Sequence, residues 1–72
     1  MKRPELVSLG NNIRSIRMEK GISQEKLAER ASIHRTYLGG VERGERNVSL
    51  INLVRISRAL EVLPEVLLKG IS

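Results

Sequence analysis

The sequence predicts an all-α protein of five short helices, in which the second and third form a helix-turn-helix unit. Three observations lead to this prediction. Apolar residues recur at spacings of three and four along most of the chain, and residues that cap helix ends stand between these runs. No stretch shows the polar and apolar alternation of a half-buried strand. At 72 residues, we treat 1–72 as one domain.

The first helix is predicted from apolar residues that follow one another at spacings of three, four and three. Pro4 suits the first turn of a helix, and Gly21 suits the position after its end, so the helix should end near Lys20. We expect Gly10 to weaken it locally and residues 1–5 to form a loose tail. The apolar series is Leu6, Leu9, Ile13 and Ile16.

The second and third helices are predicted within residues 23–42. Ser23 can cap the second helix, and a polar run that opens at His34 begins the third. A turn of about 3–4 residues between two helices defines the helix-turn-helix unit, whose second helix fits a DNA major groove. The inward positions are Leu27, Ala28 and Ala31 on the second helix, and Leu38 and Val41 on the third.

Two further helices follow a polar loop at residues 43–47, in which Gly44 suits a left-handed backbone. Ser49 is a plausible cap for the fourth helix, and Pro64 can open a short fifth helix that ends at Gly70. We expect the fourth helix to face inward with Leu50, Leu53, Val54, Ser57 and Leu60, and to place Ile51 and Ile56 on a flank.

The charge balance favours a polyanionic partner. The chain carries +5 at pH 7 and has a pI near 10.5, and nucleic acid is the obvious candidate. A solvated face that only keeps the chain soluble is the alternative. Eight of the thirteen basic residues lie between positions 14 and 46, namely Arg14, Arg17, Lys20, Lys26, Arg30, Arg35, Arg43 and Arg46.

The residue types present argue against catalysis and against metal binding. The chain has no cysteine, no aspartate and a single histidine, so no nucleophile, base and orienting group can be assembled, and we expect neither an enzyme nor a cofactor or metal. The N-terminal stretch has no apolar signal region, and no run of about 18 apolar residues occurs. We therefore expect a cytoplasmic protein with no membrane partner and no small-molecule ligand.

The segments SQEKLAERA and RTYLGGVERGERN carry a family resemblance. The run from position 14 to 60 resembles the DNA-binding domain of phage repressors and XRE-type regulators, and HRTYLGGVERGERNVSL at 34–50 is most similar to the controller proteins of restriction-modification systems. The resemblance implies a compact phage-repressor-like fold and a homodimeric, sequence-specific transcriptional regulator. Such a protein would bind a pseudo-palindromic double-stranded DNA operator and control a restriction-modification operon that includes its own gene.

The same resemblance implies a bacterial or phage protein that is associated with the nucleoid when bound to DNA. By analogy, RNA polymerase is a further partner, with Glu25 near one of its subunits. The alternative function is an antitoxin or another protein-interaction module with the same fold.

The base contacts are predicted at the start of the third helix, with Arg35, Thr36 and Tyr37. The planar fork of Arg35 suits the O6 and N7 acceptors of guanine, and Thr36 offers a hydroxyl and a methyl group. Three alternatives stay open: Arg35 contacts only phosphate, Thr36 only supports the helix start, or Tyr37 belongs to the core.

Contacts to the DNA backbone are predicted on both sides of the third helix. Gln24 can donate to a phosphate at a helix N-terminus, and the resemblance to phage repressors strengthens this role. The resemblance to controller proteins implies a clamp at positions 43, 46 and 47. Any one of these arginines could instead be a solvated charge. The full set is Arg17, Ser23, Gln24, His34, Arg43, Arg46 and Asn47.

A dimer interface is predicted from the surplus of aliphatic residues towards the C-terminus, although the same residues could simply close the core. The set is Ile51, Val54, Val62, Leu63, Val66 and Leu67, with Ile71 beside it. In such a dimer the two recognition helices lie about one DNA turn apart, roughly 34 Å.

One departure from the family pattern concerns Gly39 and Gly40, where relatives often have Ser-Gly. Two glycines inside a helix cost about 1 kcal/mol each relative to alanine. Close helix packing or close approach of the DNA backbone would explain them.

Overall fold

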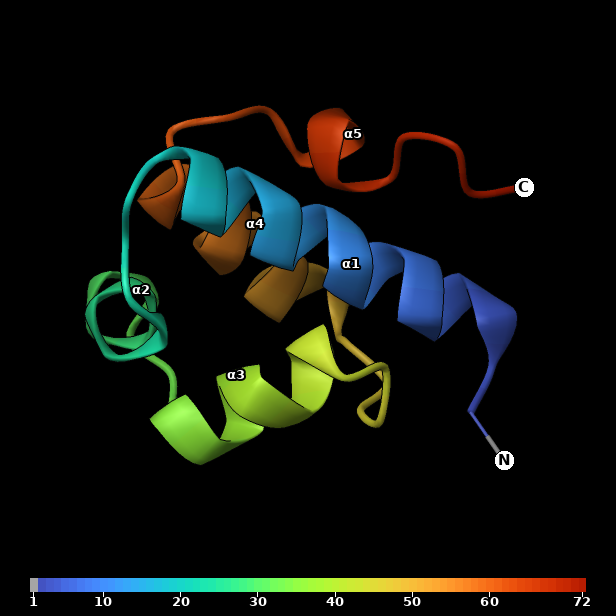
Figure 1. Cartoon of the computed structure of the whole chain (residues 1–72), viewed down its shortest axis with the longest axis horizontal. Coiled ribbons are helices and arrows are strands. Elements are labelled where there is room, and N and C mark those ends of the chain that lie inside the picture. Colours follow the sequence, from blue (N-terminus) through green and yellow to red (C-terminus); the bar gives the residue numbers. More distant parts are fainter. Residues whose placement is uncertain (1) are drawn as a thin grey trace.

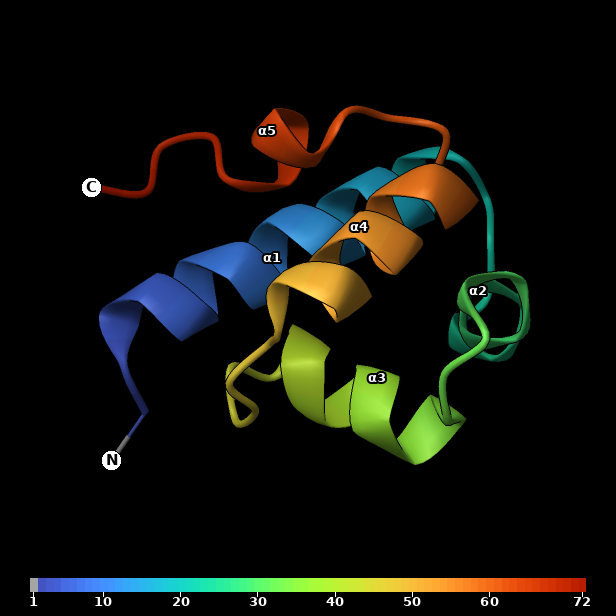
Figure 2. The ribbon, with the colours of Figure 1, turned by 180° about the vertical axis from the view of Figure 1, so that it is seen from behind.

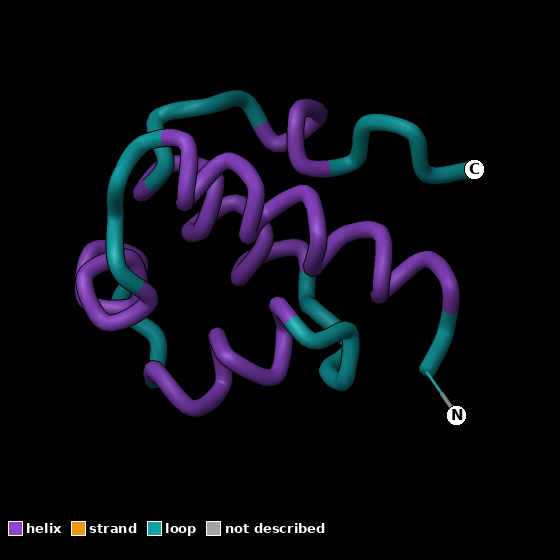
Figure 3. The backbone as a smooth tube through the Cα atoms, viewed as in Figure 1, coloured by secondary structure: helices purple, strands orange, loops and turns teal. Residues whose placement is uncertain are grey.

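Helix α1 (Pro4–Glu19) is the longest of the five helices and crosses the molecule in Figure 1. The protein is described by a computed structural model of residues 2–72, which measures 28 × 23 × 22 Å. The other helices are α2 (Gln24–Ala31), α3 (Arg35–Glu42), α4 (Leu50–Ala59) and α5 (Pro64–Leu67). Residues 2–72 contain no strand (Figure 3), so the predicted all-α class is confirmed.

The helices pack in pairs that bring distant parts of the chain together. Helix α1 packs against α3 and α5, α4 packs against α2 and α5, and α2 packs against α3. Helices α3 and α5 lie at opposite edges of the molecule in Figures 1 and 2. One side of α3 is therefore available to a partner.

Aliphatic residues from all five helices form the core, as the apolar spacings predict. The inward positions expected on α2 and α3 are buried, which confirms those two stripes. The buried apolar residues are Leu9, Ile13, Leu27, Ala28, Ala31, Leu38, Val41, Leu53, Ile56, Leu60 and Leu67.

The stripe predicted for α4 needs correction at two positions. Leu50 was expected to face inward but is 73% exposed, whereas Ile56 was expected on a flank and is fully buried. The stripe that packs against α2 and α5 runs through Leu53, Ile56 and Leu60, at spacings of three and four.

Gly10 has the opposite role to the one predicted, because α1 passes through it without interruption. A Cβ atom at this position would lie 2.4 Å from the carbonyl oxygen of Val41 and 2.6 Å from that of Glu42. Glycine thus allows α1 to approach the C-terminal end of α3 closely. The loose tail expected at residues 1–5 is also wrong from Pro4 onwards, where the helix begins; Met1 lies outside the described residues.

The predicted caps and loop are largely confirmed. The Ser23 hydroxyl accepts a hydrogen bond from the backbone N–H of Lys26 at 3.0 Å, and Gly21 and Gly44 adopt positive φ angles of 68° and 76°. Helix α5 is shorter than predicted, since it ends at Leu67 and turns follow as far as Gly70.

Candidate nucleic-acid interface

Helices α2 and α3 are joined by the short turn that defines a helix-turn-helix unit. Helix α2 ends at Ala31, and its C-cap residue Ser32 is in the left-handed conformation with φ 57°. The backbone N–H of Ile33 donates to the carbonyl of Ala28 at 3.0 Å. Ile33 packs against the core, and His34 then occupies the N-cap position of α3. The turn thereby fixes the angle between the two helices.

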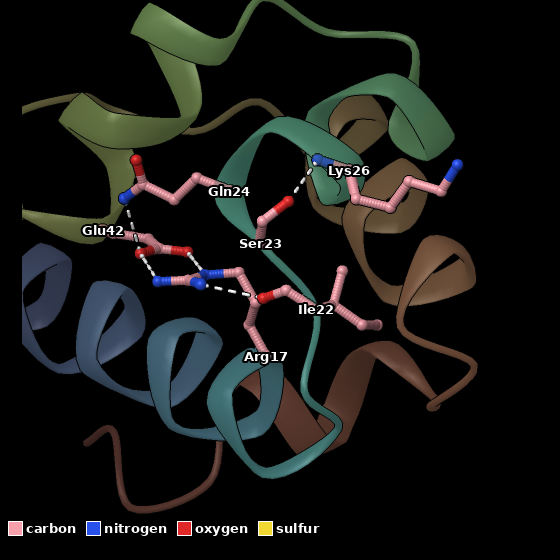
Figure 4. Close-up of polar contacts among 6 residues, drawn as sticks. All are labelled: Arg17, Ile22, Ser23, Gln24, Lys26 and Glu42. Atoms are coloured by element: carbon pink, nitrogen blue, oxygen red, sulfur yellow. Dashed lines mark hydrogen bonds and ion pairs between the residues drawn. The ribbon is translucent and has the colours of Figure 1, made fainter.

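A buried ion pair holds this unit to α1 (Figure 4). The Nε of Arg17 donates to one carboxylate oxygen of Glu42 at 2.7 Å, and its Nη2 donates to the other at 3.0 Å. Arg17 also donates to the backbone carbonyl of Ile22 at 2.9 Å, and Gln24 donates to Glu42 at 2.9 Å. The two charged side chains are only 12% and 2% exposed, so the network fixes α1, α2 and α3 relative to one another.

This network corrects the prediction that Arg17 contacts the DNA backbone. Its guanidinium donates three hydrogen bonds inside the protein, and its side chain is only 12% exposed. Arg17 is therefore a structural residue. Gln24 is half-buried and uses its amide for Glu42, but a side-chain amide carries two N–H groups. The second one keeps Gln24 a predicted phosphate contact.

The residues predicted to read bases begin at the exposed N-terminal end of α3. Arg35 and Thr36 are both exposed, and the Arg35 guanidinium donates to Glu25 at 3.2 Å. The side chains of Arg35 and Glu25 are 66% and 75% exposed. Such exposed ion pairs contribute little to stability, because water competes for both charges. Breaking the Arg35–Glu25 pair therefore costs little, and the contact of Arg35 with a base stays a prediction.

Tyr37 belongs in part to the core, which is the alternative that the sequence left open, and its contact with a base stays a prediction. Its half-buried ring packs against the core, and its hydroxyl accepts a hydrogen bond from the side-chain amide of Asn52 at 3.2 Å. The guanidinium carbon of Arg46 lies 5.9 Å from the centre of the ring. Tyr37 thus connects α3, α4 and the loop between them.

The remaining predicted backbone contacts are exposed on both sides of α3. Ser23 caps α2, whereas the His34 side chain forms no capping hydrogen bond. Arg43 pairs with Glu45 at 3.0 Å across an exposed surface. Their contacts with DNA stay predictions, as do those of Arg46 and Asn47, which are also exposed.

The predicted dimer surface is largely exposed in the single chain. Ile51 is 67% exposed, Leu63 64% and Val66 38%, while Val54 and Val62 are half-buried. These five residues can all contribute to a contact with a second copy. The prediction for the sixth residue, Leu67, needs correction.

Leu67 is fully buried in the core of one chain and cannot take part in such a contact. Its neighbours on α5 are more exposed than Leu67, because only one side of this single helical turn faces the core. Sequence reasoning had no way to choose which of these aliphatic residues faces inward.

Sequence reasoning missed two residues that matter to the site. Glu42 was not singled out, although an acidic residue in the last turn of a helix opposes the helix dipole and so indicates a specific partner. Leu50 was assigned to the core, yet it is 73% exposed, like its neighbour Ile51 at 67%. Together they form an exposed apolar pair at the start of α4.

Residues 2–72 hold neither a membrane-spanning helix nor a cluster of metal ligands. No helix in this range is long and apolar enough to cross a bilayer. No group of three potential metal ligands comes together in it.

Comparison with known proteins places this geometry in a family. The helix-turn-helix family model matches residues 13–67. Control protein C.BamHI from Bacillus amyloliquefaciens is 53% identical over 60 residues, which cover 82% of this chain and 74% of that protein.

Solved structures agree. The restriction-modification controller protein C.AhdI from Aeromonas hydrophila has a TM-score of 0.89 and 46% identity, covering 90% of this chain and 98% of that one. The C.Esp1396I controller tetramer, solved in complex with its natural 35 base-pair operator, has a TM-score of 0.85 and 38% identity, covering 92% and 87%. With its fold, its helix-turn-helix and these relatives in agreement, the chain belongs to the helix-turn-helix family and, within it, to the controller proteins of restriction-modification systems.

Proposed function

We propose that this chain is a sequence-specific transcriptional regulator, and not an enzyme, that binds a pseudo-palindromic DNA operator as a homodimer. It controls a restriction-modification operon that includes its own gene. The observation that carries the proposal is the exposed N-terminal end of α3, where Arg35 and Thr36 project from a helix pair fixed by the buried Arg17–Glu42 network. The operator complex of the related C.Esp1396I supports it.

In the complex, α3 enters the major groove with its N-terminal end first. Arg35 releases Glu25 and donates both arms of its guanidinium to a guanine, and Thr36 and Tyr37 contact neighbouring bases. Because Asn52 of α4 holds the hydroxyl of Tyr37, the Tyr37 side chain meets its base in a fixed position relative to α4.

Phosphates on either side of the groove are bound by exposed groups that flank α3. On one side are the N-terminus of α2 with Ser23, the second amide N–H of Gln24, and His34. On the other side are Arg43, Arg46 and Asn47 in the loop that follows α3. The net charge of +5 attracts the protein to DNA before specific contacts form.

The second copy binds the exposed apolar surface at the start of α4 and around α5. Ile51, Leu63 and Val66 provide its exposed part, Val54 and Val62 its half-buried margin, and the exposed Leu50 extends it. A twofold pair places the two α3 helices about 34 Å apart, one turn of DNA. RNA polymerase is a further partner, near Glu25, in the cytoplasm of the host.

Fluorescence anisotropy with the DNA upstream of its own gene tests the proposal. We expect Arg35→Ala to weaken specific binding by about 5- to 150-fold, since a bidentate arginine–guanine contact contributes about 1–3 kcal/mol of discrimination. Arg14→Ala is the matched control, because Arg14 is an exposed arginine of α1 to which no contact is assigned. Binding that ignores the DNA sequence, or that Arg35→Ala leaves unchanged, would overturn specific readout by this helix.

A further inference from the structure

We propose that Gly40 and Tyr37 are positioning residues that hold the side chain of Arg46 in place for its contact with DNA. The surface formed by the Gly40 backbone and the Tyr37 ring is called the Arg46 cradle below. The proposal rests on the proposed function, in which Arg46 contacts the DNA backbone. It explains a glycine inside the recognition helix that neither helix packing nor backbone geometry requires.

The environment of Gly40 contains the first half of the cradle. Gly40 is buried within α3, but the atoms nearest to a Cβ placed there all belong to Arg46: its Cγ at 2.9 Å, its Nε at 3.3 Å and its Cδ at 3.7 Å. The stem of Arg46 therefore lies along the backbone of α3. Any side chain at position 40 would occupy the same space and push Arg46 away.

The backbone at position 40 does not need glycine for its own conformation. Gly40 is not among the residues with positive φ, and glycine inside a helix is unfavourable by roughly 0.5–1 kcal/mol relative to alanine. Gly10, by contrast, meets the backbone of another helix. What a larger residue at position 40 would displace is a flexible, exposed side chain, and this points to a role in placing that side chain.

The Tyr37 ring forms the second half of the cradle. Positions 37 and 40 are three residues apart and so lie on one face of the helix. The guanidinium carbon of Arg46 is 5.9 Å from the ring centre, within the range of a cation–π interaction. Asn52 holds the ring by its hydroxyl at 3.2 Å, and the Ser49 cap holds the backbone of Asn52 at 3.1 Å.

Placing Arg46 in advance reduces the cost of binding DNA. A long side chain in an exposed loop loses rotamer freedom when it binds, and this loss weakens affinity by about two- to tenfold for each side chain that becomes ordered. The cradle holds the stem and one face of the guanidinium, while Arg46 as a residue stays exposed. Its outer side is thus free to meet a phosphate without a search through rotamers.

A double-mutant cycle on operator binding tests the proposal. We expect Arg46→Ala to weaken affinity about tenfold, as for a hydrogen bond to a charged group. Gly40→Ala should weaken it about three- to tenfold. In the Arg46→Ala background, Gly40→Ala should change affinity less than about twofold, because the side chain that it displaces is gone.

Gly39→Ala is the matched control for this cycle. It is the same substitution one position earlier in α3, so it brings the same gain in helix propensity. Its Cβ would meet the Nη1 of Arg43 at 3.2 Å and the amide oxygen of Gln24 at 3.8 Å, and no atom of Arg46 is among its nearest neighbours. We expect the effects of Gly39→Ala and Arg46→Ala to be additive.

Nuclear magnetic resonance provides a readout that needs no DNA. The Arg46 Hδ and Hε protons should show ring-current shifts in the wild type, in Gly39→Ala and in Tyr37→Phe. The shifts should vanish in Gly40→Ala and in Tyr37→Leu, with the helical circular dichroism of Gly40→Ala unchanged.

The outcomes separate the two proposals. If Arg46→Ala binds the operator as tightly as the wild type, the DNA contact of Arg46 fails, and its positioning role fails with it. If Arg46→Ala weakens binding but Gly40→Ala is additive with it, or leaves the Arg46 protons unmoved, the DNA contact stands and the cradle is refuted.

Discussion

Removing one member of the buried Arg17–Glu42 pair should cost this protein a large part of its stability. The Glu42 side chain is 2% exposed and accepts hydrogen bonds of 2.7 and 3.0 Å from Arg17. Arg17→Met leaves this carboxylate buried with only the Gln24 amide as a partner. Breaking such a pair costs about 3–5 kcal/mol. A chain of this length has a free energy of unfolding of only about 4–11 kcal/mol.

The double variant Arg17→Met/Glu42→Leu distinguishes charge pairing from simple packing. It removes both charges, and replacing a buried ion pair with apolar residues is often neutral or stabilising. We therefore expect it to be more stable than Arg17→Met, and within about 2 kcal/mol of the wild type. Urea unfolding followed by far-ultraviolet circular dichroism gives the free energies.

A matched control comes from the exposed pair Arg35–Glu25, whose side chains are 66% and 75% exposed. Glu25→Gln should change the free energy of unfolding by less than about 1 kcal/mol, because water already solvates both charges. A stabilising role of the buried ion pair is refuted if the free energy of unfolding of Arg17→Met lies within about 1 kcal/mol of the wild-type value, or if the double variant is less stable than Arg17→Met.

Further predictions concern packing, capping and assembly. Gly10→Ala should destabilise the fold by about 1–3 kcal/mol in urea unfolding, since its Cβ would meet backbone carbonyls at 2.4 and 2.6 Å; an unchanged midpoint would contradict close packing of α1. Leu67→Ala should cost about 2–5 kcal/mol, because Leu67 is fully buried, and a smaller loss in urea would place it outside the core. Leu63→Ser, at a residue 64% exposed, should leave the fold intact but weaken self-association in sedimentation; unchanged association would remove Leu63 from the proposed interface. Ser23→Ala should cost about 1 kcal/mol in thermal unfolding through loss of its 3.0 Å cap bond; an unchanged melting temperature would contradict a stabilising role for this cap.

The sequence predicted the helices well because their signals are local. Spacing and caps located all five helices, and Ser23 and Gly21 stand at the predicted boundaries. The inward stripe of α4 was harder to predict from the sequence. Its N-terminal half is almost entirely apolar, so two stripes fit the same letters, and only packing against α2 and α5 selects the one with Ile56 inside and Leu50 outside.

The errors in the site come from contacts between residues far apart in the sequence. Arg17 and Glu42 are 25 positions apart, and no local pattern links them. Viewed alone, Arg17 is one more cation in a basic protein. The prediction for Gly10 was wrong for the same reason. The helix propensity of glycine is a local property, whereas the role of Gly10 depends on its contact with α3. Arg35 and Thr36 were correctly expected at the exposed start of α3 because that depended only on helix boundaries.

The buried and the exposed residues of α3 have different roles, and this bears on how such a protein can change the DNA sequence that it binds. Leu38, Val41 and Glu42 are buried and hold the helix to the rest of the molecule, whereas Arg35 and Thr36 are exposed. Substitutions at the exposed positions should therefore leave the fold intact. Under the proposed function, a scaffold of this kind can acquire a different operator preference by exchanging a few surface residues while its interior stays the same.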